Sequence, residues 1–128
     1  MLFRYTILFV EDVAASLAFY ERAFGLTRRF LHDGGDYGEL ATGETRLAFS
    51  SVRLMQQLGK SPSRPRPEAP VFEIAFETDD VAAALAQAMV AGAVLVQPVR
   101  QEDWGQTTAY VRDPDGYLVE LCSPVPGA

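Results

Sequence analysis

The feature that most constrains this chain is a repeat of one short helical segment. Residues 12–18 read DVAASLA and residues 80–86 read DVAAALA, so six of the seven positions are identical. An apolar stretch of strand character precedes each copy, and a glycine follows each copy, at Gly25 and Gly92. A repeat of this kind indicates one structural unit that is written twice along the chain.

Each copy carries the signals of a capped, amphipathic helix. Asp12 and Asp80 stand where a side-chain oxygen can accept a hydrogen bond from the first free backbone N–H groups. The glycine after each copy can take the left-handed conformation that ends many helices. Apolar residues recur at helical spacing on one face of each copy, at Val13, Leu17, Tyr20 and Phe24 in the first and at Val81, Leu85 and Ala88 in the second.

Short apolar strands separated by turn residues follow each helix, so each half reads β-α-β-β-β. This order predicts an α+β fold in which one domain, residues 1–128, contains two modules. Module 1 spans about residues 1–58 and module 2 about residues 71–124. Between them, residues 59–70 contain four of the eight prolines and are interpreted as a linker.

Composition excludes several classes of protein. The net charge of −6 argues against a nucleic-acid surface, which needs a basic patch. No apolar run is long enough to span a membrane, and residues 1–10 lack the features of a signal peptide, so we expect a soluble, cytoplasmic protein without a membrane partner. The single cysteine, Cys122, is expected in the core, and the single histidine, His32, is expected in a solvated turn.

Two longer stretches carry a resemblance to a known family. With DVAASLAFYERAFGL near the start and DPDGYLVEL near the end, the chain resembles the vicinal-oxygen-chelate superfamily over nearly its whole length. That superfamily includes glyoxalase I, extradiol dioxygenases, fosfomycin-resistance enzymes and bleomycin-resistance proteins. The resemblance implies that each module curls into half of a partly open, mixed-sheet barrel around a cleft. It also implies a homodimer.

The resemblance further implies four metal-ligand positions, on the first and last strand of each module. Carried onto this sequence, they are Tyr5, Ala48, Glu73 and Glu120. The set contains no histidine, and an alanine stands where one ligand is needed. Two carboxylates could hold Mg²⁺ or Ca²⁺ weakly through waters, but they suit Zn²⁺, Ni²⁺ or Fe²⁺ poorly. We therefore predict no metal site and no cofactor, with weak divalent binding at Glu73 and Glu120 left open.

Strand alternation then predicts which side chains face the cleft. On the strand before the second helix, Glu73 is expected to face it, whereas Phe72, Ile74 and Phe76 are expected to pack beneath the helix. On the last strand, Glu120 is expected to face away from Val119 and Leu121. The predicted ligand-binding residues are Tyr5, Phe9, Arg46, Ala48, Glu73, Trp104, Tyr110 and Glu120.

Three functions remain open at this point. The first is a small-molecule-binding protein of the bleomycin-resistance type, which sequesters an aromatic or cationic compound without a metal and so confers antibiotic resistance. The second is a glyoxalase-like lyase, an isomerase or a dioxygenase that uses an altered metal site, or Glu73 and Glu120 as acid and base. The third is a structural or regulatory dimer. The missing histidines favour a protein that is not an enzyme.

Overall fold

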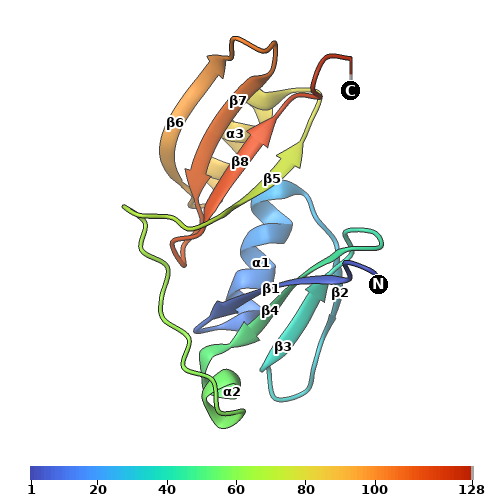
Figure 1. Ribbon diagram of the computed structural model, residues 1–128, viewed down its shortest axis with the longest axis vertical. Coiled ribbons are helices and arrows are strands. Elements are labelled where there is room, and N and C mark those ends of the chain that lie inside the picture. Colours follow the sequence, from blue (N-terminus) through green and yellow to red (C-terminus); the bar gives the residue numbers. More distant parts are fainter. Residues whose placement is uncertain (128) are drawn as a thin grey trace. The chain divides into compact units, whose positions relative to one another are not determined.

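The computed structural model describes residues 1–127, and Figure 1 shows its helices and strands. The chain divides into two compact units, residues 1–64 and residues 65–128. Each unit repeats the order strand, helix, three strands, with a short second helix at the end of the first set. The elements are β1 (Tyr5–Val10), α1 (Val13–Phe24), β2 (Arg28–Leu31), β3 (Tyr37–Leu40), β4 (Arg46–Ser51), α2 (Val52–Gln57), β5 (Glu73–Glu77), α3 (Val81–Val90), β6 (Val94–Gln101), β7 (Thr107–Arg112) and β8 (Leu118–Cys122).

Hydrogen bonding defines one four-stranded mixed sheet in each unit. Sheet A has the order β1-β4-β3-β2, and sheet B has the order β5-β8-β7-β6. In each sheet the first and last strands of the module are parallel neighbours, and the remaining pairs are antiparallel. The predicted α+β fold with two β-α-β-β-β modules is confirmed, although neither sheet closes into a barrel.

The helix of each unit covers one face of its own sheet. In unit 1, α1 packs against β2, β3 and β4, and Gly38 marks the side that it covers. A Cβ at Gly38 would lie only 2.6 Å from a methyl carbon of Leu17 and 3.3 Å from one of Val13, both on α1. Only glycine permits this close approach of helix and strand. The buried core of the unit includes Leu8, Val10, Tyr20, Leu40 and Phe49.

In unit 2, α3 packs in the same way on β6, β7 and β8. Val119 and Leu121 of β8 are buried with Val111 of β7, as the alternation of β8 predicts. One expectation is wrong, because Phe72 precedes β5, is 49% exposed and contacts the ring of Tyr117 at 6.0 Å. An ideal strand would place Phe72 on the same side as Ile74, but β5 begins only at Glu73.

The helix caps explain why the repeated segment has the same conformation twice. Asp12 accepts a hydrogen bond from the N–H of Ala15 at 3.0 Å, and Asp80 accepts one from the N–H of Ala83 at 3.0 Å. Gly25 ends α1 in the left-handed region, with φ of 67°. None of the helices in residues 1–127 combines the length and the apolar character needed to cross a bilayer.

Candidate functional site

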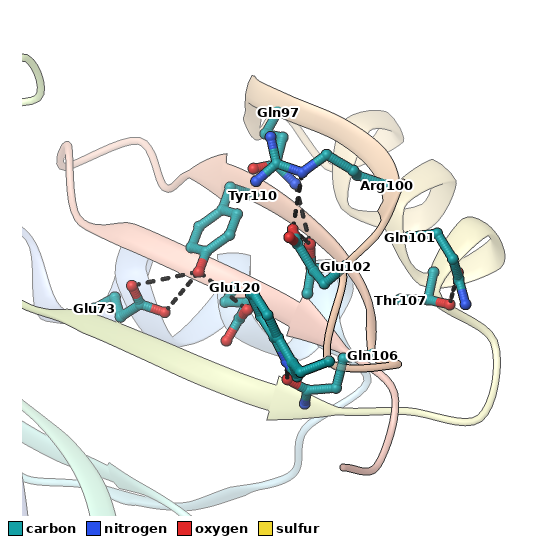
Figure 2. Close-up of polar contacts among 11 residues, drawn as sticks. Glu73, Gln97, Arg100, Gln101, Glu102, Gln106, Thr107, Tyr110 and Glu120 are labelled. Carbon is teal, nitrogen blue, oxygen red and sulfur yellow. Dashed lines mark hydrogen bonds and ion pairs between the residues drawn. The ribbon is translucent and has the colours of Figure 1, made fainter. Parts of the chain in front are cut away.

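Each sheet has a second face, opposite its helix, which we call the helix-free face. In sheet B this face carries Glu73 from β5, Tyr110 from β7 and Glu120 from β8. Tyr110 is the direct partner of Glu120 across the antiparallel pair, and Glu120 lies opposite Ala75 in the parallel pair. Three strands therefore bring two carboxylates and one phenol to one place, as Figure 2 shows.

The hydroxyl of Tyr110 joins the two carboxylates. Its oxygen lies 3.0 Å from Glu120 Oε2 and 3.1 Å from Glu73 Oε2, with a longer contact of 3.5 Å to Glu73 Oε1. A phenol has one proton to donate, so it can bond strongly to only one carboxylate at a time. Among residues 1–127, no arginine, lysine or histidine forms an ion pair with Glu73 or Glu120. The cluster thus has an excess of negative charge.

The excess of negative charge affects the pKa values of the side chains in the cluster. Partial burial raises the pKa of Glu120 above its ordinary value of 4.5, and the negative charge of Glu73 raises it further, against the hydrogen bond from Tyr110, which lowers it. Burial and the two carboxylates also raise the pKa of the Tyr110 phenol, so this side chain stays neutral and remains a donor. A cation placed here would relieve the repulsion between the two acids.

A second polar group on sheet B is neutralised internally. Glu102 accepts hydrogen bonds from Arg100 at 2.8 Å and from the buried Thr108 at 2.9 Å, and these bonds lower its pKa. Gln97, the cross-strand partner of Tyr110, donates to Thr108 at 3.1 Å. The network fixes polar side chains of β6 and β7, and it contains no positive partner for Glu73 or Glu120.

Trp104 lies in the turn between β6 and β7, and its side chain is 59% exposed. Its indole N–H donates to Gln106 at 2.7 Å, and Gln106 donates in turn to the backbone oxygen of Ser123 at 2.8 Å. These bonds hold the ring in place while its faces stay open to solvent. The sequence-based hypothesis that Trp104 contacts a ligand therefore stays a prediction.

The remaining predicted site residues lie in sheet A. Tyr5 and Phe9 are on β1, and Arg46 and Ala48 on β4, with Tyr5 opposite Arg46 in the parallel register. They share the helix-free face, but their exposure differs: Tyr5 is 48% exposed, whereas Ala48 has no exposed surface. Other atoms of the chain therefore cover Ala48 completely.

Sequence reasoning missed three charged or polar residues on this face. Glu39 is buried, and it binds Tyr37 at 2.7 Å and Arg29 at 3.0 Å. The alternation of Tyr37 and Glu39 along β3 was a usable signal. Arg29 could not be placed by alternation, because a bulge between Arg28 and Phe30 changes the register of β2 at that residue.

Comparison with known proteins decides the family. The model of the Glyoxalase/Bleomycin resistance protein/Dioxygenase superfamily matches residues 2–121, nearly the whole chain. The chain belongs to this superfamily. The curated protein YraH of Bacillus subtilis (strain 168), described as uncharacterized, is 27% identical over 117 residues, which cover 89% of this chain and 91% of YraH.

Solved structures of the superfamily show the same fold. A glyoxalase-related enzyme from Fulvimarina pelagi superposes with a TM-score of 0.83 at 24% identity, covering 97% of this chain and 88% of the other. A glyoxalase/bleomycin resistance protein/dioxygenase family enzyme from Burkholderia phytofirmans PsJN superposes with a TM-score of 0.77 at 22% identity, covering 96% and 98%. At these identities the likeness extends to the fold alone.

The resemblance implies a divalent metal in the enzymes of the superfamily, and the donors around Glu73 and Glu120 are a poor fit to a zinc or iron site. Within residues 1–127, no three histidine, cysteine, aspartate or glutamate side chains are grouped so that they could hold a metal ion. Glu73 and Glu120 offer carboxylate oxygens, but Tyr110 is held neutral between them and Ala48 has no donor atom. A zinc or iron site uses three or more converging donors, usually including imidazole.

Proposed function

We propose that this protein binds a small cationic compound with an aromatic part, and that Glu73, Glu120 and Tyr110 are its recognition site. The observation that carries the proposal is the Tyr110 hydroxyl placed between two carboxylates that have no positively charged partner among the described residues. Like charges held together at a partly buried position cost free energy, and a bound cation offsets that cost. Binding of this kind requires neither a metal nor a chemical step.

The aromatic part of the ligand is proposed from two side chains. Tyr110 presents a half-buried ring beside the carboxylates, and Trp104 presents an exposed ring held by its hydrogen bond to Gln106. Aromatic faces attract cations and planar rings alike. Sequestration of a toxic compound, as in antibiotic resistance, is the biological role that this chemistry supports.

The test uses rhodamine 6G, a planar dye that keeps one positive charge over the working pH range. We expect its fluorescence anisotropy to rise on binding, and we expect Glu73→Gln and Glu120→Gln each to weaken binding by about tenfold, as for one charge-assisted contact. Glu44→Gln is the matched control, because it removes the same charge from an exposed turn of unit 1. Equal losses in all three variants would reduce the effect to net charge and contradict the proposal.

Trp104 is tested with the same dye. Trp104→Ala should weaken binding by about 1 to 3 kcal/mol if the indole stacks on the ligand. Wild-type affinity in this variant, measured by calorimetry, would remove Trp104 from the site and leave the carboxylate pair as the proposed contact.

An acid/base enzyme is the second candidate, and the raised pKa of Glu120 is the observation that favours it. A carboxylate whose pKa is raised accepts a proton more readily than an ordinary one. The corresponding assay follows isomerisation of the hemithioacetal of methylglyoxal and glutathione, with no metal added. Turnover that disappears in Glu120→Gln would establish the enzyme in place of the binding protein.

A homodimer belongs to the same proposal. Strand β6 is the edge of sheet B and exposes Val94, Leu95, Val96 and Val99, each between 43% and 49%. An apolar edge strand of this length is normally covered by another chain or segment. Sedimentation equilibrium at micromolar concentration should give twice the monomer mass of 14.0 kDa; a monomer would contradict the dimer.

A further inference from the structure

The helix-free face of sheet A carries a cluster that we call the arginine face: Arg29 and Phe30 of β2, Tyr37 and Glu39 of β3, and Arg46 of β4. Phe30 lies opposite Glu39, and Glu39 lies opposite Ala48, so the three strands present these side chains together. Gly38, between Tyr37 and Glu39, faces α1, which places both neighbours on the other side.

Glu39 is the centre of this cluster and is only 3% exposed. Arg29 donates to its Oε1 at 3.0 Å, and Tyr37 donates to its Oε2 at 2.7 Å. Arg46 Nε approaches the same Oε1 at 3.7 Å. A carboxylate buried to this degree needs positive partners, so Glu39 holds both guanidinium groups in fixed positions.

One carboxylate leaves the two arginines with a net charge of +1. Each guanidinium has five N–H donors, and the contacts to Glu39 use a minority of them. The side chain of Arg29 is 46% exposed and that of Arg46 is 22% exposed, so further donors face outward. In residues 1–127, neither arginine pairs with a second carboxylate.

A cluster of aromatic rings lies beside Arg29. The guanidinium carbon of Arg29 lies 5.7 Å from the ring centre of Phe30. His32 stacks on Phe30 with ring centres 4.9 Å apart, and Tyr37 lies 6.0 Å from Phe30 and 5.6 Å from His32. His32 is exposed beside the turn at residues 33–34, as expected, and its ring lies against those of Phe30 and Tyr37.

We propose that the arginine face binds a planar aromatic monocarboxylate. The carboxylate pairs with the outward donors of Arg29 and Arg46, and the ring lies along the aromatic side chains. The fork of a guanidinium group matches a planar carboxylate with two parallel hydrogen bonds, and a net charge of +1 balances a monoanion. This binding uses side chains of sheet A alone, and its charge preference is opposite to that of the cation site proposed on sheet B.

The test compares three probes with one ring system: 1-pyrenecarboxylate, neutral 1-pyrenemethanol and cationic 1-pyrenemethylammonium. Fluorescence anisotropy should show that Arg46→Gln weakens binding of the carboxylate by at least about tenfold and leaves binding of the alcohol unchanged. Arg46→Lys keeps the charge but loses the fork, and it should also weaken the carboxylate. Arg53→Gln is the matched control. It removes an exposed arginine of α2 that pairs with Asp36 and is not part of the arginine face.

A second measurement uses the wild-type protein and does not depend on how the variants fold. Addition of 2-naphthoate should shift the backbone amide resonances of residues 28–50 in a ¹H–¹⁵N correlation spectrum. The shifts should saturate as the concentration of 2-naphthoate increases. Shifts confined to residues 73–122, or no saturable shifts, would overturn the proposal. Equal affinity for the three pyrene probes, or unchanged carboxylate affinity in Arg46→Gln, would overturn it as well.

Discussion

Sheets A and B share one topology and differ in how they treat buried charge. The strand registers make Ala48 of β4 the counterpart of Glu120 of β8, and Glu39 of β3 the counterpart of Tyr110 of β7. Both sheets thus contain a tyrosine bonded to a glutamate on the helix-free face. In sheet A the acid stands on the third strand of the module, whereas in sheet B it stands on the last.

The neighbours of the two acids make this difference consequential. Glu39 is buried and satisfied by Arg29, Arg46 and Tyr37, whereas Glu120 is half-buried beside a second acid. A buried charge that has its partners is costly to disrupt by removing one of them, whereas an unbalanced charge costs stability and favours a ligand. The comparison teaches that the same scaffold supports a structural carboxylate in one copy and a recognition carboxylate in the other.

The largest effect is expected for Ala48→Glu, which places an acid in sheet A at the position that Glu120 has in sheet B. This substitution tests whether the two sheets differ in their tolerance of that acid. Ala48 has no exposed surface and lies directly opposite Glu39, so the new side chain would be overpacked beside a like charge. We expect a loss of about 3 kcal/mol in the free energy of unfolding. Urea denaturation measures it, with Glu120→Ala as the reverse change, expected within about 0.5 kcal/mol of wild type. A stable Ala48→Glu protein would show that this face has room after all.

A smaller loss is expected for Glu39→Gln, which removes one charge with little change of shape. The two arginines then keep their positive charges without a counter-charge, at a cost of about 2 kcal/mol, moderated because Arg29 is half-exposed. Glu73→Gln is the matched change in sheet B and should cost nothing or stabilise the fold. Similar losses in the two variants, measured by thermal unfolding, would refute the distinction between the two acids.

The helix caps should respond equally in the two copies. Asp12→Ala and Asp80→Ala each remove a 3.0 Å hydrogen bond to the third residue of a helix, and each should cost about 1 kcal/mol. Asp79→Ala, one residue before the second cap, serves as the control and should have little effect. Denaturation curves that differ by more than about 1 kcal/mol between the two cap variants would show that the copies are not equivalent scaffolds.

The smallest effect on stability is a pH dependence in sheet B. Because the folded protein raises the pKa of Glu120, folding favours its protonated form, and stability falls as the pH rises from about 4.5 through the folded pKa. Glu120→Gln should remove this part of the decline. Tyr110→Phe removes the hydrogen bond that lowers the pKa, so the decline should extend to higher pH. Unfolding free energies measured between pH 4 and 8 would decide this, and identical profiles in all three proteins would contradict it.

The fold was predictable because local signals agreed with one another. The repeated segment from Asp12 and from Asp80 contains its own cap, its apolar face and a glycine after its end. The resemblance to the superfamily implied that Glu73 and Glu120 lie close together, and strand alternation gave the side of its strand on which each one stands. The helix signals and the alternation use only residues that are near in sequence.

The arginine face was less predictable because it depends on an irregular strand. A regular β2 would put Arg29 on the opposite face from Phe30, yet Arg29 reaches Glu39, the partner of Phe30. A bulge changes the direction of a side chain without a residue type that announces it. The burial of Ala48 was equally hidden, since alternation gives the face of a residue but not what fills the space around it.

The register that places Glu39 opposite Ala48 also bears on how such a protein evolves. A single base change converts any alanine codon into a codon for glutamate or aspartate, so an acid at position 48 is always one mutation away. With Glu39 and its arginines in place, however, that mutation would set two carboxylates side by side in a buried position. The order of mutations therefore matters: Glu39 would have to be replaced before an acid at position 48 became tolerable. Of the two copies, sheet A is therefore the one in which an acid on the last strand requires a second, earlier change, whereas sheet B can keep its own or lose it by one mutation.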